Sequence, residues 1–205
     1  MVDPIRLPAG QLAALQVAYS TPPRAYHSFA HVQEVLRHYG EVDAGPGWRQ
    51  PAEPWVAVLY HDAIYVPGRR DNELHSASLA LEHIQHWLPD AGLNGARVAE
   101  LIELTARHGS VSAGDLGTGP GALDAMHFLD CDMAILGASA DTFGAYDRGI
   151  AAEYAGVLPA VVFRFNRRRF LKSLLERDRI FLSEYFHERY DASARENIER
   201  ALGSG

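Results

Sequence analysis

Histidines and acidic residues gather in four short segments of the chain, and their types suit the binding of a metal ion. The segments are residues 26–31 (YHSFAH), 61–62 (HD), 71–73 (DNE) and 130–132 (DCD). Imidazole nitrogens and carboxylate oxygens together bind divalent cations such as manganese, iron, cobalt, nickel, zinc or magnesium. Such a cation lowers the pKa of a bound water and so makes a nucleophile near neutral pH. We therefore predict a metal centre built from several segments.

The pair His61-Asp62 stands in an otherwise apolar stretch, AVLYHDAIY. Consecutive apolar residues predict a buried helix, and two strongly polar side chains are costly there unless something pairs with them. A metal ion would pair with both side chains. The alternative is that Asp62 only holds the His61 imidazole in a buried hydrogen bond.

Two further pairs offer the remaining ligands. His27 and His31 are four residues apart, so on a helix they share one face, and the apolar residues that follow turn this face inward. Asp130 and Asp132 interrupt the apolar run FLDCDMAILG. Residues two apart point in opposed directions, so we expect only one of these aspartates to be a ligand. The alternative is a helix N-terminus at which the helix dipole favours both acids.

The elements that must position these residues are predicted to be helices. Apolar residues recur at spacings of three and four along most of the chain, whereas the alternation typical of strands is scarce. Turn and capping residues indicate where helices break, begin or fray: Pro22-Pro23, Asp71, Ser139, Asp191 or Ser193, and the end from Gly203. We predict one compact all-α domain over residues 1–205, with about eight to ten helices.

Composition narrows the range of partners. The formal net charge of −7 disfavours sequence-independent binding to nucleic acid polymers. No stretch approaches the roughly 18 apolar residues of a membrane span, and the N-terminus lacks the apolar run of a signal peptide. The single cysteine, Cys131, cannot form an intramolecular disulfide, which favours a reducing compartment. We expect a soluble cytoplasmic protein, a monomer or homodimer, that binds neither nucleic acid polymers nor membranes.

The order His, then His-Asp, then Asp, spread over about a hundred residues of a helical chain, resembles the HD-domain superfamily of metal-dependent phosphohydrolases. The segments YHSFAHV, YHDAIY, DNELHSASLA, FLDCDMAILG and RFLKSLLERDRIF with ARENI are similar to one branch of predicted phosphohydrolases in that superfamily. The resemblance covers residues from about 24 to 200. It implies a helical HD-type domain that hydrolyses a small phosphorylated compound, such as a phosphate ester or a nucleotide.

The resemblance also implies a ligand set. It assigns His31, His61, Asp62 and Asp132 as ligands of a divalent metal ion, with Asp62 also able to bridge to a second ion. Asp130 is then expected to contact the metal ligands without binding the metal itself, or to cap a helix. The superfamily more often has alanine before the last aspartate, where this chain has cysteine.

Other residues are expected around the metal. Glu73 is assigned as the general base or water-orienting group, since a short loop would let its helix fold back over the site; a carboxylate favoured by the helix dipole is the alternative. His108, before a glycine at a helix end, is expected to contact a phosphate or protonate a leaving oxygen. His27, Arg69 and Arg70 are expected to bind substrate.

Two other functions remain open. An HD-related di-iron oxygenase would need extra histidine ligands, for which His83 and His108 are available. The second alternative function is a non-catalytic module that binds a metal or a nucleotide. The basic run over residues 164–179 is expected to be mainly a solvated helix face.

Overall fold

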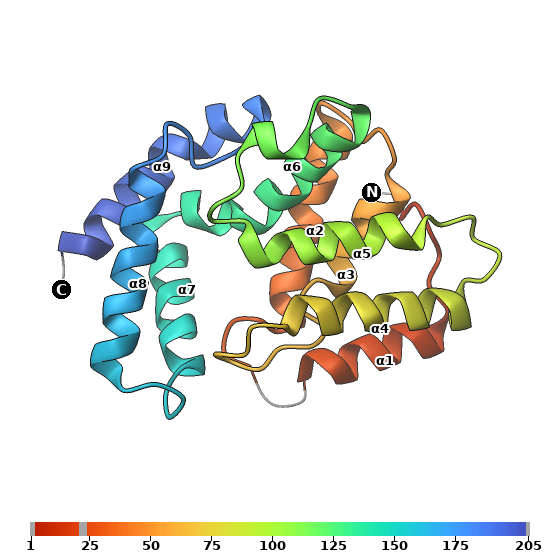
Figure 1. Cartoon of the computed structure of the whole chain (residues 1–205), viewed down its shortest axis with the longest axis horizontal. Helices are drawn as coiled ribbons and strands as arrows, with labels where there is room; N and C mark the ends of the chain where they lie inside the picture. Colours follow the sequence, from red (N-terminus) through yellow and green to blue (C-terminus); the bar gives the residue numbers. More distant parts are fainter. Residues whose placement is uncertain (1–2, 21–23, 204–205) are drawn as a thin grey trace.

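The computed structural model of the chain describes residues 3–20 and 24–203 (Figure 1). Within these ranges the chain is all-helical, which confirms the predicted fold class, and Ala155 and Leu158 form an isolated bridge. The α-helices are α1 (Ala9–Ser20), α2 (Phe29–Ala44), α3 (Ala52–Tyr60), α4 (Asn72–Trp87), α5 (Gly95–Leu104), α6 (Pro120–Met133), α7 (Ala140–Glu153), α8 (Ala160–Leu175) and α9 (Glu184–Gly203). Three short 3-10 segments are η1 (Thr105–Arg107), η2 (Ala113–Leu116) and η3 (Ala134–Gly137).

Helix α3 forms the centre of the core. Every residue from Pro54 to Tyr60 is buried, as expected for a helix that is apolar on all sides. It packs against α2, α4, α5 and α6, so helices distant in sequence surround it. In Figure 1 α4 and α5 lie side by side across this region, and they make extensive contacts. The segment that carries His61-Asp62 therefore emerges from the middle of the bundle.

The last three helices lie at one end of the molecule (Figure 1). Helix α9 packs on η3 and α8, and η3 directly follows the end of α6. Gly137 of η3 lies so close to α9 that an added Cβ would be 2.8 Å from the Tyr190 carbonyl oxygen. Arg167 of α8 donates from Nε to Asp147 of α7 at 2.9 Å. These contacts fix the C-terminal helices against the end of α6.

Several predicted boundaries are wrong. Helix α3 ends at Tyr60, so His61 and Asp62 follow the buried helix instead of lying inside it. Helix α9 begins at Glu184, well before the predicted start at Asp191 or Ser193. Asp191 is buried within α9, where its Oδ1 accepts from the backbone N–H groups of the preceding loop. In the sequence such an aspartate resembles a helix cap, but in the structure it accepts hydrogen bonds from a loop and does not begin a helix.

The predicted caps have mixed outcomes. The Ser139 side chain accepts from the Thr142 N–H and caps α7, as predicted. Asp71 stands at the N-cap position of α4 but caps no N–H with its side chain, because its carboxylate pairs with Arg69 and His75. Instead, the buried Asn72 amide holds the preceding loop. Its oxygen accepts a hydrogen bond from the Val66 N–H, and its nitrogen donates one to the Val66 carbonyl oxygen.

None of the helices in the described ranges is both long and apolar enough to span a membrane. The predicted break at Pro22-Pro23 and the last two residues of the predicted frayed end, Ser204 and Gly205, lie outside the described residues.

Candidate metal centre

Three segments bring four side chains to one point. His31 lies in the first turn of α2, His61 and Asp62 follow the end of α3, and Asp132 lies in the last turn of α6. The three helices pack against one another in pairs. Their meeting therefore follows from the packing of the core, and no long loop has to reach across the molecule.

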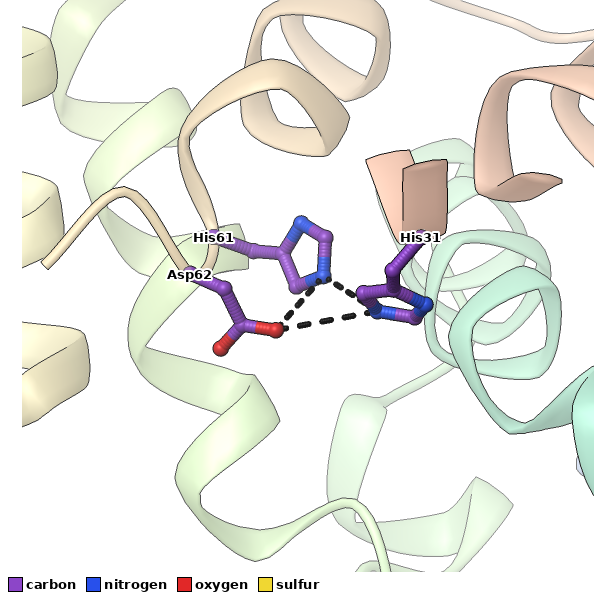
Figure 2. A group of neighbouring side chains, drawn as sticks. All are labelled: His31, His61 and Asp62. Atoms are coloured by element: carbon purple, nitrogen blue, oxygen red, sulfur yellow. Dashed lines mark hydrogen bonds and ion pairs between the residues drawn. The ribbon is translucent and has the colours of Figure 1, made fainter. Parts of the chain in front are cut away.

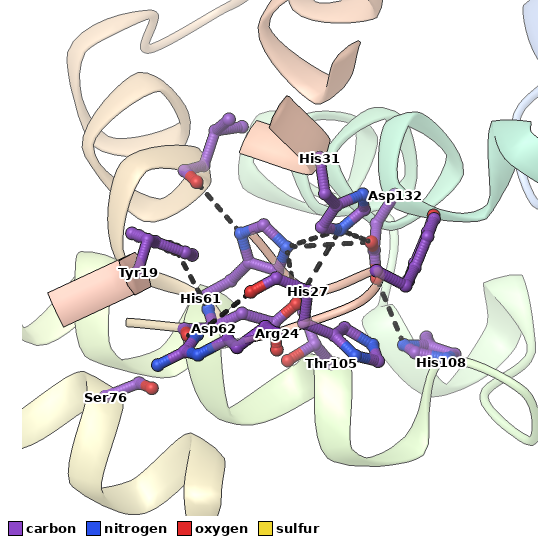
Figure 3. Close-up of polar contacts among 12 residues, drawn as sticks. Tyr19, Arg24, His27, His31, His61, Asp62, Ser76, Thr105, His108 and Asp132 are labelled. Carbon is purple, nitrogen blue, oxygen red and sulfur yellow. Dashed lines mark hydrogen bonds and ion pairs between the residues drawn. The ribbon is translucent and has the colours of Figure 1, made fainter. Parts of the chain in front are cut away.

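The donor atoms of these side chains point toward one another (Figures 2 and 3). His31 Nε2 lies 3.1 Å from His61 Nε2 and 3.6 Å from Asp62 Oδ2. His61 Nε2 lies 3.2 Å from Asp62 Oδ2. Asp132 Oδ1 completes the cluster at 3.1 Å from His31 Nε2 and 3.6 Å from His61 Nε2. We call these four residues the His-Asp cluster.

The spacing in the His-Asp cluster suits a cation. Metal bonds to imidazole nitrogen and carboxylate oxygen are about 2.1 Å long, so neighbouring donors on one ion lie about 3.0–3.4 Å apart. The two imidazole nitrogens that face each other at 3.1 Å share a proton or a cation, because two bare lone pairs at this distance would repel. A divalent cation would satisfy both nitrogens and both carboxylates.

The surroundings of His61 fix its orientation. Its Nδ1 lies 2.8 Å from the Val58 carbonyl oxygen, which accepts the Nδ1 proton. Such a contact behind a metal-binding histidine leaves Nε2 free to bind a cation. Arg24 donates to the carbonyl oxygens of Asp62 and Ala63, at 2.5 and 2.9 Å, and fixes the turn that carries the pair.

The electrostatics of the cluster also favour a cation. Burial opposes charge on Asp62, but the His61 and His27 rings lower the pKa of this carboxyl well below its ordinary value. Burial also opposes charge on Asp132, whose pKa the hydrogen bond to His31 lowers. Although burial works against protonation of His61, the Asp62 and Asp132 carboxylates raise its pKa to about 9. Two carboxylates therefore stay charged in the interior and attract positive charge, from protons or from a metal ion.

The two aspartates of the DCD segment have different places. Asp132 faces the cluster, whereas the Asp130 carboxylate accepts from the Leu182 and Ser183 N–H groups at 2.8 Å and from the Ser183 hydroxyl at 2.6 Å. Asp130 thus ties α6 to the segment before α9. Both aspartates lie at the C-terminal end of α6, so the alternative of a helix N-terminus is wrong.

Three further predicted site residues line a cavity beside the His-Asp cluster. The cavity has a volume of about 120 Å³, and its lining includes Asp62 and Asp132 together with His27, Glu73 and His108. His108 Nδ1 lies 3.3 Å from Asp132 Oδ2 (Figure 3). Glu73 lies in the first turn of α4, and its place in the cavity lining sets this turn beside the cluster.

Arg69 and Arg70 are not brought to this cavity. Both side chains are exposed, and neither belongs to the residues that line the cavity. Arg69 pairs with Asp71 at 2.5 Å. The geometry gives no support to their predicted role in substrate binding.

The sequence reasoning missed Glu153, at the end of α7. Its Oε1 accepts from the N–H groups of Tyr26 and His27 at 2.7 and 2.9 Å, and its Oε2 lies 2.6 Å from His27 Nδ1. Burial disfavours the charged carboxylate, yet the bond with His27 lowers the pKa of Glu153 to about 2. No local pattern marks this residue, because its partners are more than a hundred residues away in sequence.

Comparisons of the chain with protein-family models, with curated proteins and with solved structures find no match. The chemistry of the site therefore rests on its geometry and on the residues that form it.

Proposed function

We propose that the protein is a metal-dependent phosphohydrolase, with the ligand set of the HD-domain superfamily, that acts on a small phosphorylated compound. One observation carries the proposal: four donor groups from α2, α6 and the segment after α3 meet at the edge of a cavity, with 3.1–3.6 Å between neighbouring donor atoms. Two imidazole nitrogens and two carboxylate oxygens converge on one point, and a divalent cation is a positive partner that all four groups could share.

His31, His61, Asp62 and Asp132 would hold the cation. When bound, a divalent cation lowers the pKa of a water and polarises a phosphoryl oxygen. Two neutral imidazoles and two carboxylates together carry a charge of about −2, which balances a divalent ion and leaves its coordination shell open to water and substrate. The mixed nitrogen and oxygen set suits manganese, iron, cobalt, nickel, zinc or magnesium.

The proposed reaction needs two proton transfers. The oxygen of a water forms a bond to phosphorus while the ester P–O bond breaks, which gives inorganic phosphate and an alcohol. Glu73, at the cavity wall, accepts the proton that the water loses. His108, on the same cavity, donates the proton that the leaving oxygen takes up. Proton exchange with solvent then returns Glu73 to its carboxylate form and His108 to its protonated form.

His27 has the position of a substrate-holding group. Glu153 holds its Nδ1, so the other edge of the ring is left for the cavity, where His27 forms part of the lining. A ring fixed in this way keeps one orientation, and a positioned donor binds a phosphate oxygen with little loss of side-chain entropy.

The other two functions have less support. A di-iron oxygenase would need additional histidines at the metal, but the His83 ring instead bonds the Tyr60 hydroxyl at 2.9 Å, and of the two histidines named for that role only His108 is near the cluster. A binding module without catalysis would use the same metal ligands as the proposed phosphohydrolase but would release no phosphate.

The proposal predicts that Glu73→Gln keeps the bound metal and slows phosphate release by about 100-fold or more, because a proton acceptor contributes roughly that factor. Metal content and phosphate release are measured on the same preparation. Glu82→Gln, at an exposed position of the same helix, is the matched control and should behave as the wild type. Wild-type turnover in Glu73→Gln would remove this residue from the mechanism.

A further inference from the structure

The cavity beside the His-Asp cluster is small for an enzyme that acts on nucleotides. Its volume of about 120 Å³ is well below the volume of pockets for drug-sized ligands, about 300–1,000 Å³. A phosphoryl group with a few further atoms fills this space. A nucleoside adds a ribose and a base, which the cavity cannot enclose.

Packed aromatic rings set this size. Tyr26, Tyr65, Tyr146 and Phe170 all line the cavity. The Tyr26 ring packs on the Tyr146 ring with centroids 4.7 Å apart, and the Tyr65 ring packs on His27 at 4.1 Å. Rings that pack on one another leave little freedom to open the space, since widening it would break these contacts.

The cavity is also short of cations. Among the described residues that line it there is no lysine or arginine. Arg24 and Arg167 are screened from it: Arg24 stacks on the Tyr65 ring at 5.7 Å, and Arg167 stacks on the Tyr146 and Phe170 rings at 4.9 and 5.6 Å.

Both guanidinium groups also have partners of their own. Arg24 donates to four backbone carbonyl oxygens, those of Ala18, His27, Asp62 and Ala63. Arg167 donates to Asp147. Enzymes that bind a nucleoside triphosphate use lysine, arginine and backbone N–H groups along the phosphate chain. Among the described lining residues, only His27 and His108 have side chains that could carry positive charge, and together with a cation they suit a single phosphoryl group.

We infer that the substrate is a phosphomonoester of a compact alcohol, and that the packed rings exclude nucleoside mono- and triphosphates. This inference rests on the proposed function, and it identifies the size and charge of the substrate of the same site. Phe170 is then a specificity-determining residue, because its ring closes the cavity on the side of α8.

The test compares phosphate release by the manganese-loaded protein from glycerol 3-phosphate, phosphoglycolate, AMP and ATP. The expected kcat/KM for the better of the two compact esters exceeds that for AMP and ATP by about 100-fold or more, the penalty for a misfit of a few kcal/mol. Equal or faster hydrolysis of AMP or ATP would overturn the inference and leave the proposed phosphohydrolase function intact.

A binding measurement separates the proposed phosphohydrolase function from the proposed size limit on the substrate. In the manganese-loaded protein, inorganic phosphate is expected to raise the melting temperature, and AMP at the same concentration to raise it less. If none of the four compounds is hydrolysed while phosphate still binds and AMP does not, the phosphohydrolase proposal fails and the size limit stands. Tighter binding of AMP than of phosphate would overturn the size limit.

The substitution Phe170→Ala tests whether the Phe170 ring is what excludes nucleotides from the cavity. Removal of the ring is expected to raise the kcat/KM for AMP relative to that for the better compact ester by about tenfold. Phe165→Ala, on the same helix with its side chain 66% exposed, should leave the ratio unchanged. If Phe170→Ala leaves the ratio unchanged while circular dichroism shows intact helices, Phe170 does not limit the substrate.

Discussion

At the scale of single residues, the His-Asp cluster explains why charged groups lie in the interior of this protein. Buried carboxylates are costly unless they are paired. Asp62 and Asp132 are paired with His31 and His61, and these pairs are strong enough to hold the pKa of His61 near 9 when burial alone would lower it. A proton and a metal ion therefore compete for the same nitrogen.

This competition predicts how metal binding depends on pH. The His61 pKa rises from 6.5 to about 9 on folding, so in the metal-free protein its protonated form contributes stability below about pH 6.5, and this contribution is lost as the pH rises through about 9. Metal binding needs the neutral ring, so the apparent affinity should increase with pH by up to about tenfold per unit and level off near pH 9.

Calorimetric titration with manganese between about pH 6.5 and about pH 8.5 measures this dependence. Heats in buffers of different ionisation enthalpy give the number of protons released. His75→Ala, which removes an exposed histidine of α4, should show the same dependence as the wild type. An affinity that stays constant over this range would show that no ligand is protonated before the metal binds.

At the scale of helices, Asp130 and Asp132 divide two tasks between neighbouring positions of α6. Their opposed directions were predictable from the sequence, since residues two apart on a helix diverge by about 200°. Which of them faces the metal could not be derived from that geometry, because it depends on where the segment before α9 lies. The boundaries of α3 and α9 were missed for a related reason: polar residues at helix ends and polar residues buried by tertiary contacts look alike in sequence.

The division of tasks predicts different effects of two substitutions. Asp130→Ala leaves the part-buried Leu182 N–H, the buried Ser183 N–H and the Ser183 hydroxyl without their acceptor, so the free energy of unfolding should fall by about 3 kcal/mol. Its manganese affinity, measured at low temperature, should stay near that of the wild type. Asp132→Ala should lose manganese affinity while keeping the contacts between α6 and the segment before α9. Urea denaturation and metal titration together check this, and an Asp130→Ala protein of wild-type stability would contradict it.

At the scale of the whole molecule, the order of helices brings early, middle and late parts of the chain to one place. The all-helical class and five of the cavity-lining residues were predictable, because each lies in a local pattern of apolar and polar residues: His27, Asp62, Glu73, His108 and Asp132. Glu153 and the ring of Phe170 were not, since their roles come only from contacts across the bundle. Arg69 and Arg70 were predicted from proximity in sequence, and the loop instead directs them to solvent.

The most direct test of the account is the manganese content of the protein after the metal has been stripped and resupplied. We expect the wild type and His75→Ala to bind at least one equivalent, and His31→Ala, His61→Ala, Asp62→Ala and Asp132→Ala each to lose it while circular dichroism shows that the helices remain. If these four variants keep the full wild-type amount of metal, the side chains gathered from α2, α6 and the segment after α3 do not form a metal centre.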